Sequence, residues 1–122
     1  MIISKQFEFE AAHKLPDIEC YGKCSQMHGH TYKLIIEIDG AVNQFGWVVN
    51  FKTLKAIVID KVINILDHSY LNELIELPTA ENIILWIDKQ VKNDIESIQE
   101  NIVKLKSITL YETSISYAKL TY

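Results

Sequence analysis

Hydrophobic and polar residues alternate in the first part of the chain. From residue 7 to residue 13, every second side chain falls on one side of an extended chain: Phe7, Phe9, Ala11 and His13. A second alternation runs from His28 to Ile38 and stops at Asp39 and Gly40. A period of two is typical of strands that bury one face. We therefore predict strands over residues 2–13 and 28–38, a loop over 15–26, and a hairpin that residues 47–49 complete with the second strand.

After Asn50, the spacing of the apolar residues changes from that of a strand to that of a helix. The Asn50 side chain suits a helix N-cap. Apolar residues then recur at spacings of three and four: Phe51, Leu54, Ile57, Val58, Val62, Ile65 and Leu66. Thr79 is a second candidate N-cap, and a similar stripe follows it: Ala80, Ile83, Ile84, Ile87, Val91 and Ile95. The two stripes predict amphipathic helices that pack on a core. Alternation returns over residues 102–112 and 115–122, which predicts a closing hairpin that turns at Thr113 and Ser114.

The order of elements is strand, strand, helix, helix, strand, strand. This order predicts an α+β fold, in which a four-stranded antiparallel sheet carries two helices on one face. At 122 residues, the chain is expected to form a single domain over residues 1–122. A sheet of this kind leaves two edges open, so we also expect the chain to form a homo-oligomer.

Composition narrows the class of protein. The net charge is −4, and no dense cluster of cations is available to follow a phosphate backbone, so we expect no nucleic-acid partner. A small phosphorylated ligand needs only a few local cations, so the composition does not exclude such a ligand. No apolar run approaches the roughly 18 residues of a membrane span, and no signal peptide is recognised, so we expect a cytoplasmic protein without a membrane partner. Two cysteines argue against a disulfide framework and for metal binding or catalysis.

The candidate metal ligands are histidines. His28 and His30 lie two positions apart on a predicted strand, so both imidazoles project from one face. His13 ends the other predicted strand and is a candidate third ligand, which would give an open, catalytic zinc site. A closed structural site made by Cys20, Cys24, His28 and His30 is the alternative. Its spacings fit poorly with the usual zinc-finger pattern, but they do not exclude it.

Four further residues are candidates for chemistry. Cys24, in a cationic neighbourhood, would be a reactive thiolate beside the metal. Asp67 and His68 could relay a proton, although a histidine at a helix C-terminus beside a turn aspartate is the more ordinary interpretation. Glu112 ends an alternating run at a turn, where its carboxylate could accept hydrogen bonds from two adjacent N–H donors of a flat heterocycle.

Several short motifs follow one another along nearly the whole chain. They are Phe-Glu-Ala-Ala-His-Lys-Leu from Phe9, Lys-Cys from Lys23, His-Gly-His from His28, Gly-Trp-Val-Val-Asn-Phe from Gly46, Leu-Asp-His from Leu66 with Leu71 and Asn72, Pro-Thr-Ala-Glu-Asn from Pro78, and Glu112 with Thr113. Each motif is weak alone, but together and in order they are specific. The chain resembles the 6-pyruvoyltetrahydropterin synthase superfamily, and within it the bacterial 6-carboxytetrahydropterin synthases of queuosine biosynthesis.

This resemblance implies a tunnelling fold, in which subunits join their sheets into a barrel and place active sites at their interfaces. It implies a zinc ion on His13, His28 and His30, a catalytic thiol at Cys24, and relay partners at Asp67 and His68. The resemblance also implies a pterin-binding pocket, in which Glu112 would anchor the pterin and Thr79 and Glu81 would help line the walls. Lys14, Lys23 and Lys33 are candidates by position for binding a triphosphate.

The resemblance also implies a reaction. It is the conversion of 7,8-dihydroneopterin triphosphate to 6-carboxy-5,6,7,8-tetrahydropterin, with release of acetaldehyde and triphosphate. Three residues separate Cys24 from His28, as in the queuosine enzymes, whereas the tetrahydrobiopterin enzymes have a longer gap. Asn50 departs from the aspartate usual in the family, and Asn caps a helix about as well. The alternatives are a 6-pyruvoyltetrahydropterin synthase, a pterin-binding protein without activity, and a non-catalytic zinc-binding interaction module.

Overall fold

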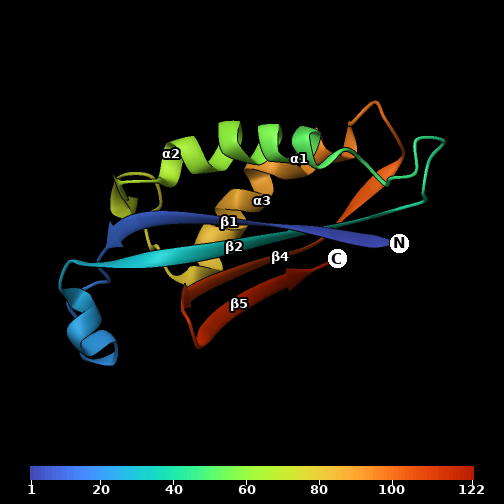
Figure 1. The fold of residues 1–122 in the computed structure, drawn as a ribbon. Helices are drawn as coiled ribbons and strands as arrows, with labels where there is room; N and C mark the ends of the chain where they lie inside the picture. The colour runs from blue at the N-terminus through green and yellow to red at the C-terminus, as the bar shows by residue number, and fades with distance from the viewer.

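A mixed five-stranded sheet with helices on one face forms the molecule, and the computed structural model describes residues 1–122 (Figure 1). The long strands are β1 (Ile2–His13), β2 (His28–Gly40), β4 (Val103–Thr113) and β5 (Ser116–Thr121), and β3 (Ser69–Tyr70) is short. The helices are η1 (Glu19–Ser25), α1 (Phe51–Val58), η2 (Ile59–Ile63), α2 (Asn64–Leu66), η3 (Leu71–Glu73) and α3 (Ala80–Glu96). The α+β prediction is therefore confirmed. None of the helices has the length and apolar content needed to cross a membrane.

The prediction of four antiparallel strands is wrong by one strand. The sheet order is β3-β1-β2-β4-β5, and β3 pairs in parallel with β1 through Ala11 with Ser69 and Ala12 with Tyr70. Two residues are too few to show a period of two, so the sequence pattern contains no signal for β3.

The prediction that residues 47–49 complete a hairpin is also wrong, because this segment bends and is not a strand. Val48 and Val49 are both buried although they are consecutive, which an alternating half-buried strand does not allow. The side-chain amide of Asn101 donates to the carbonyl of Val48 and holds the segment against the core. The long antiparallel partners of β2 are β1 and β4.

Both predicted helix N-caps are confirmed. The Asn50 side chain accepts a hydrogen bond from the Lys52 amide at 2.9 Å, and the Thr79 hydroxyl accepts one from the Asn82 amide at 3.3 Å. The first predicted helix is a continuous run of α1, η2 and α2, with a π-helical turn in its middle. Glu100 adds a carboxylate at the start of α1, where it accepts from the Asn50 amide and the Thr53 hydroxyl. A negative charge is thus present at this helix start without an aspartate at position 50.

The core lies between the helices and one face of the sheet. The side chains of Phe9, Tyr32 and Leu34 on that face are buried, together with Leu54 on α1 and Ile87 on α3. The other face of β1 and β2 carries polar side chains, such as Glu8 opposite Lys33, and no helix covers it (Figure 1). We call these the helix face and the open face of the sheet. The predicted loop before β2 contains the 3-10 helix η1, which is interrupted at Gly22, where φ is +51°.

Candidate metal centre and substrate cavity

Strand register brings three histidines together. In the pairing of β1 with β2, His13 lies opposite His28, and Ala11 lies opposite His30. All three histidines are on the helix face, because His13 shares its phase with Phe9 and His30 shares its phase with Tyr32. Their ring centroids lie 4.5 to 5.1 Å apart, and one ligand nitrogen from each lies within 4.8 Å of the other two. The predicted three-histidine cluster is therefore present in the fold.

The hydrogen bonds of the cluster select the tautomer of two rings. The Nδ1 atom of His13 lies 2.7 Å from the Pro78 carbonyl oxygen, and Nδ1 of His28 lies 2.7 Å from that of Gln26. A carbonyl oxygen only accepts, so each Nδ1 carries a proton, and the neutral form of each ring then has its lone pair on Nε2. This is the usual orientation of metal-binding histidines, whose second nitrogen is held by an outer partner.

Two of the Nε2 atoms are buried without any hydrogen-bond partner, those of His13 and His30. Burying a polar atom without a partner costs about 1 to 3 kcal/mol, so such atoms call for an explanation. A metal ion bound to the lone pairs would satisfy both of them. The donor set of three neutral imidazoles suits Zn²⁺ in an open site with room for a further ligand.

Electrostatics also favour the neutral form of His30. Burial lowers the pKa of its imidazole below 6.5, and the neighbouring His13 and His28 act in the same direction. Glu112 opposes them, since its Oε1 lies 3.7 Å from Nε2 of His30. The net result is a pKa below 6.5, so the ring is neutral and free to bind a metal at pH 7.

The residues that the resemblance assigns to the pterin line one cavity. Thr79 and Glu81 at the start of α3 and Glu112 near the end of β4 border a space of about 260 Å³, together with Leu15 and Tyr117. The hydroxyl of Thr79 already accepts a hydrogen bond from the helix it caps. Glu112 borders both this cavity and the histidine cluster, so a ligand anchored there would have one end near the three imidazoles.

Cys24, Asp67 and His68 are not joined in the single chain. Cys24 is exposed on η1, and its carbonyl accepts from the Leu15 amide at 2.7 Å. No hydrogen bond or ion pair connects it with Asp67 or His68. Neither cysteine belongs to a group of potential metal ligands, so the closed site of Cys20, Cys24, His28 and His30 is not formed.

Asp67 and His68 lie beside β1, near its open face. Asp67 Oδ1 accepts a hydrogen bond from the Glu10 amide at 2.9 Å, and Oδ2 lies 3.1 Å from Nδ1 of His68. The hydrogen bond from the Glu10 amide is the main influence on Asp67 that holds its pKa below the usual value, and His68 adds to it. His68 directly follows Asp67, the C-cap of α2, as the more ordinary interpretation expects, and its amide donates to the Glu10 carbonyl.

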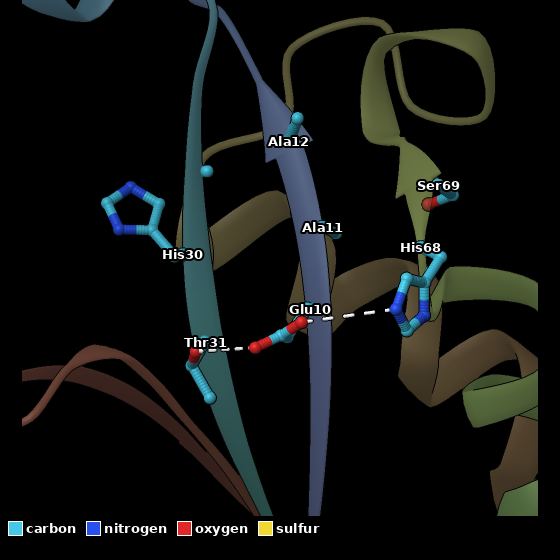
Figure 2. A pocket seen from close by; sticks show the side chains of 8 residues that line it. Glu10, Ala11, Ala12, His30, Thr31, His68 and Ser69 are labelled. Atoms are coloured by element: carbon cyan, nitrogen blue, oxygen red, sulfur yellow. Dashed lines mark hydrogen bonds and ion pairs between the residues drawn. The ribbon is translucent and has the colours of Figure 1, made fainter.

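Two residues near these groups were not found from the sequence. Glu10 reaches between Thr31 and His68 over a cavity on the open face, while His30 points away from Glu10 (Figure 2). Tyr32 follows His30 by two positions on the helix face, and its ring stacks on Phe9 with centroids 5.0 Å apart. The available signal was position alone, since Glu10 shares a motif with His13 and Tyr32 continues the phase of His30.

The buried Tyr32 hydroxyl has no hydrogen-bond partner, although the side chain is fully buried. Burial, with a contribution from Glu112, raises the pKa of its phenol far above the usual value, so the group stays neutral. Removing an unsatisfied buried hydroxyl removes a desolvation cost, so Tyr32→Phe is expected to leave the free energy of unfolding unchanged or to raise it by up to about 1 kcal/mol. Urea denaturation followed by circular dichroism measures this. A loss of more than about 1 kcal/mol would show that the hydroxyl has a partner.

Comparison with known proteins identifies the family of the chain. The sequence model of the family described as 6-pyruvoyl tetrahydropterin synthase matches residues 2–121. A Synechocystis protein named 6-carboxy-5,6,7,8-tetrahydropterin synthase is 36% identical over 125 residues, covering 97% of this chain and 91% of that protein. A Pyrococcus furiosus protein named dihydroneopterin monophosphate aldolase is 36% identical over 104 residues, covering 85% of this chain and 82% of that protein.

Among solved structures, the 6-pyruvoyl tetrahydropterin synthase of Caenorhabditis elegans has the same fold. It superposes with a TM-score of 0.84 at 23% identity, covering 100% of this chain and 95% of that chain. The family match over residues 2–121, together with these relatives, identifies the protein as a member of the 6-pyruvoyl tetrahydropterin synthase family.

Proposed function

We propose that this protein converts 7,8-dihydroneopterin triphosphate and water to 6-carboxy-5,6,7,8-tetrahydropterin, acetaldehyde and triphosphate, in the synthesis of the queuosine precursor. The observation that carries the proposal is the cluster of His13, His28 and His30, with its partnerless Nε2 atoms, beside the cavity that Glu112 borders. The 6-carboxytetrahydropterin synthase name of the Synechocystis relative supports this branch of the family. The three-residue gap between Cys24 and His28 supports it as well.

His13, His28 and His30 would hold a Zn²⁺ ion through their Nε2 atoms. When bound, Zn²⁺ supplies Lewis-acid polarisation of the hydroxyl and carbonyl oxygens of the substrate side chain. The carbonyls of Pro78 and Gln26 keep two of these rings oriented, with Nε2 free to bind the ion.

Glu112 would bind the amino-pyrimidinone edge of the pterin. Its carboxylate has two oxygens, which can accept from two adjacent N–H donors of a flat ring. Thr79 and Glu81 line the same cavity and would confine the ring there. Of the lysines considered for the triphosphate, Lys33 lies on the open face with its ammonium 4.4 Å from the Tyr111 ring centroid. Lys14 directly follows His13 and Lys23 directly precedes Cys24, so these two are the better candidates.

Proton transfer would use Cys24 together with Asp67 and His68. A thiolate at Cys24 would take a proton from the substrate side chain, and the imidazole of His68, oriented by Asp67, would return one during the retro-aldol-like cleavage. One chain does not join these groups, so we propose that subunits associate in the cytoplasm through their sheet edges into a barrel. The Asp67 and His68 of one subunit would then complete a site with Cys24 of another.

Product analysis tests this function. The zinc-loaded protein is incubated with 7,8-dihydroneopterin triphosphate, the pterin product is identified by mass spectrometry, and acetaldehyde is measured separately. Carboxytetrahydropterin with an equal amount of acetaldehyde is the expected result. A pyruvoyl product, or turnover of dihydroneopterin monophosphate alone, would refute the proposed reaction and assign another activity to the same site.

A further inference from the structure

The backbone of His68 is in a conformation that needs support. Its φ is +59°, and no other non-glycine residue of the chain has a positive φ. The left-handed region costs an ordinary residue about 1 to 2 kcal/mol, and such residues cluster at functional sites. Both main-chain groups of Glu10 supply the support, because its N–H donates to the Asp67 carboxylate and its carbonyl accepts from the His68 amide.

The side chain of Glu10 makes a separate contact with the imidazole. Its Oε2 lies 3.9 Å from Nε2 of His68, while its Oε1 accepts a hydrogen bond from the Thr31 hydroxyl at 3.3 Å (Figure 2). On the other side of the ring, Asp67 Oδ2 lies 3.1 Å from Nδ1. The imidazole of His68 therefore lies between two carboxylates, one at each ring nitrogen.

The two carboxylates act on different protonation states. When Nδ1–H of the neutral ring is directed at Asp67, Nε2 carries a lone pair and no proton. Nε2 then cannot donate a hydrogen bond to the Glu10 carboxylate. Once Nε2 is protonated, the same Glu10 oxygen becomes its hydrogen-bond acceptor and ion-pair partner. The Glu10 carboxylate is thus suited to the form of His68 that exists after the ring has taken up a proton.

We propose that Glu10 is a positioning residue for His68, whose carboxylate orients the imidazole and accepts a hydrogen bond from Nε2 while the ring carries a proton in transit. This assignment rests on the proposed function, in which His68 returns one proton to the substrate in each turnover and must therefore be protonated before that step. Because the Glu10 and His68 side chains are 65% and 76% exposed, their pair contributes little to folding stability. Its effect is expected in turnover.

Glu10→Gln tests the carboxylate without disturbing the main-chain hydrogen bonds of residue 10. Glu8→Gln is the matched control, because this substitution removes the same charge from the same open face. Glu8 lies two residues before Glu10, opposite Lys33. We expect Glu10→Gln to lower kcat by about tenfold with KM unchanged, as for a misplaced acid–base group. Glu10→Asp should recover part of the loss, and Glu8→Gln should behave as the wild type. Equal kcat values for Glu10→Gln and Glu8→Gln, or no recovery in Glu10→Asp, would overturn the assignment.

A second measurement does not depend on turnover. In NMR spectra of ¹⁵N-histidine-labelled protein at a pH where His68 is protonated, its Nε2 resonance should move in Glu10→Gln and stay in place in Glu8→Gln. A resonance that does not move in Glu10→Gln would overturn the contact, whether or not the protein is active. Wild-type protein without turnover, but with this resonance shift, would refute the proposed reaction and leave the contact supported.

Discussion

Replacing Cys24 by alanine is expected to lower kcat by about 10²- to 10⁴-fold, the range typical of a group that transfers a proton in the rate-limiting step. The thiol is exposed on η1, and the proposed mechanism uses it as the base that takes a proton from the substrate. Bound Zn²⁺ should be unchanged, because Cys24 lies outside the histidine cluster. Steady-state turnover of 7,8-dihydroneopterin triphosphate, with metal analysis of the same sample, measures both.

Cys20→Ala is the matched control for this variant. Cys20 is also an exposed, free cysteine of η1, four residues earlier. It should keep wild-type turnover and wild-type zinc content. Unchanged kcat in Cys24→Ala would refute the role of the thiol, and a loss of zinc in either variant would revive a metal site with sulfur ligands.

Replacing His30 by alanine is expected to abolish zinc binding at stoichiometric concentrations. Loss of an outer-shell partner alone weakens a metal site about 10- to 100-fold, so removal of a direct ligand should exceed about 100-fold. Isothermal titration with Zn²⁺ measures the affinity. His68→Ala is the control, because His68 is the one histidine outside the cluster, and it should bind zinc as the wild type does.

The same site predicts how zinc binding depends on pH. A ligand imidazole must be neutral, so protons compete with the metal as the pH falls. Burial lowers the pKa of His30, so proton competition at this ligand sets in at a lower pH than it would for an ordinary imidazole. Zinc affinity measured from pH 7.5 down to pH 5 should therefore fall at the acid end. Equal affinity of wild type and His30→Ala at pH 7.5 would contradict the assigned ligand set.

Alternation indicated the three candidate histidines, and the resemblance to a known family selected them over the closed site with cysteines. A period of two places His28 and His30 on one face, and the phase of Phe9 assigns His13 to the same face of the neighbouring strand. The helix starts at Asn50 and Thr79 could also be predicted from the sequence, because an N-cap needs only a suitable side chain before an apolar stripe.

Other features had no local pattern to indicate them. Strand β3 consists of Ser69 and Tyr70 and forms only because the chain returns beside Ala11 and Ala12 after the helix. The run at residues 47–49 has strand-like composition, but Val48 and Val49 are both buried by packing that no periodicity describes. The position of His68 depends on its positive φ. The sequence does not predict a positive φ for a residue other than glycine.

X-ray absorption at the zinc K-edge, recorded on the zinc-loaded protein, tests the open three-histidine site most directly. Zinc–sulfur distances near 2.3 Å and zinc–nitrogen distances near 2.0 to 2.1 Å are readily separated. The ligand set of His13, His28 and His30 predicts nitrogen and oxygen neighbours only, with an imidazole pattern and one exchangeable light atom that changes when the pterin substrate is added. One or more sulfur neighbours in the wild type, lost in Cys24→Ala, would contradict the open site and replace it with a site that includes the cysteines.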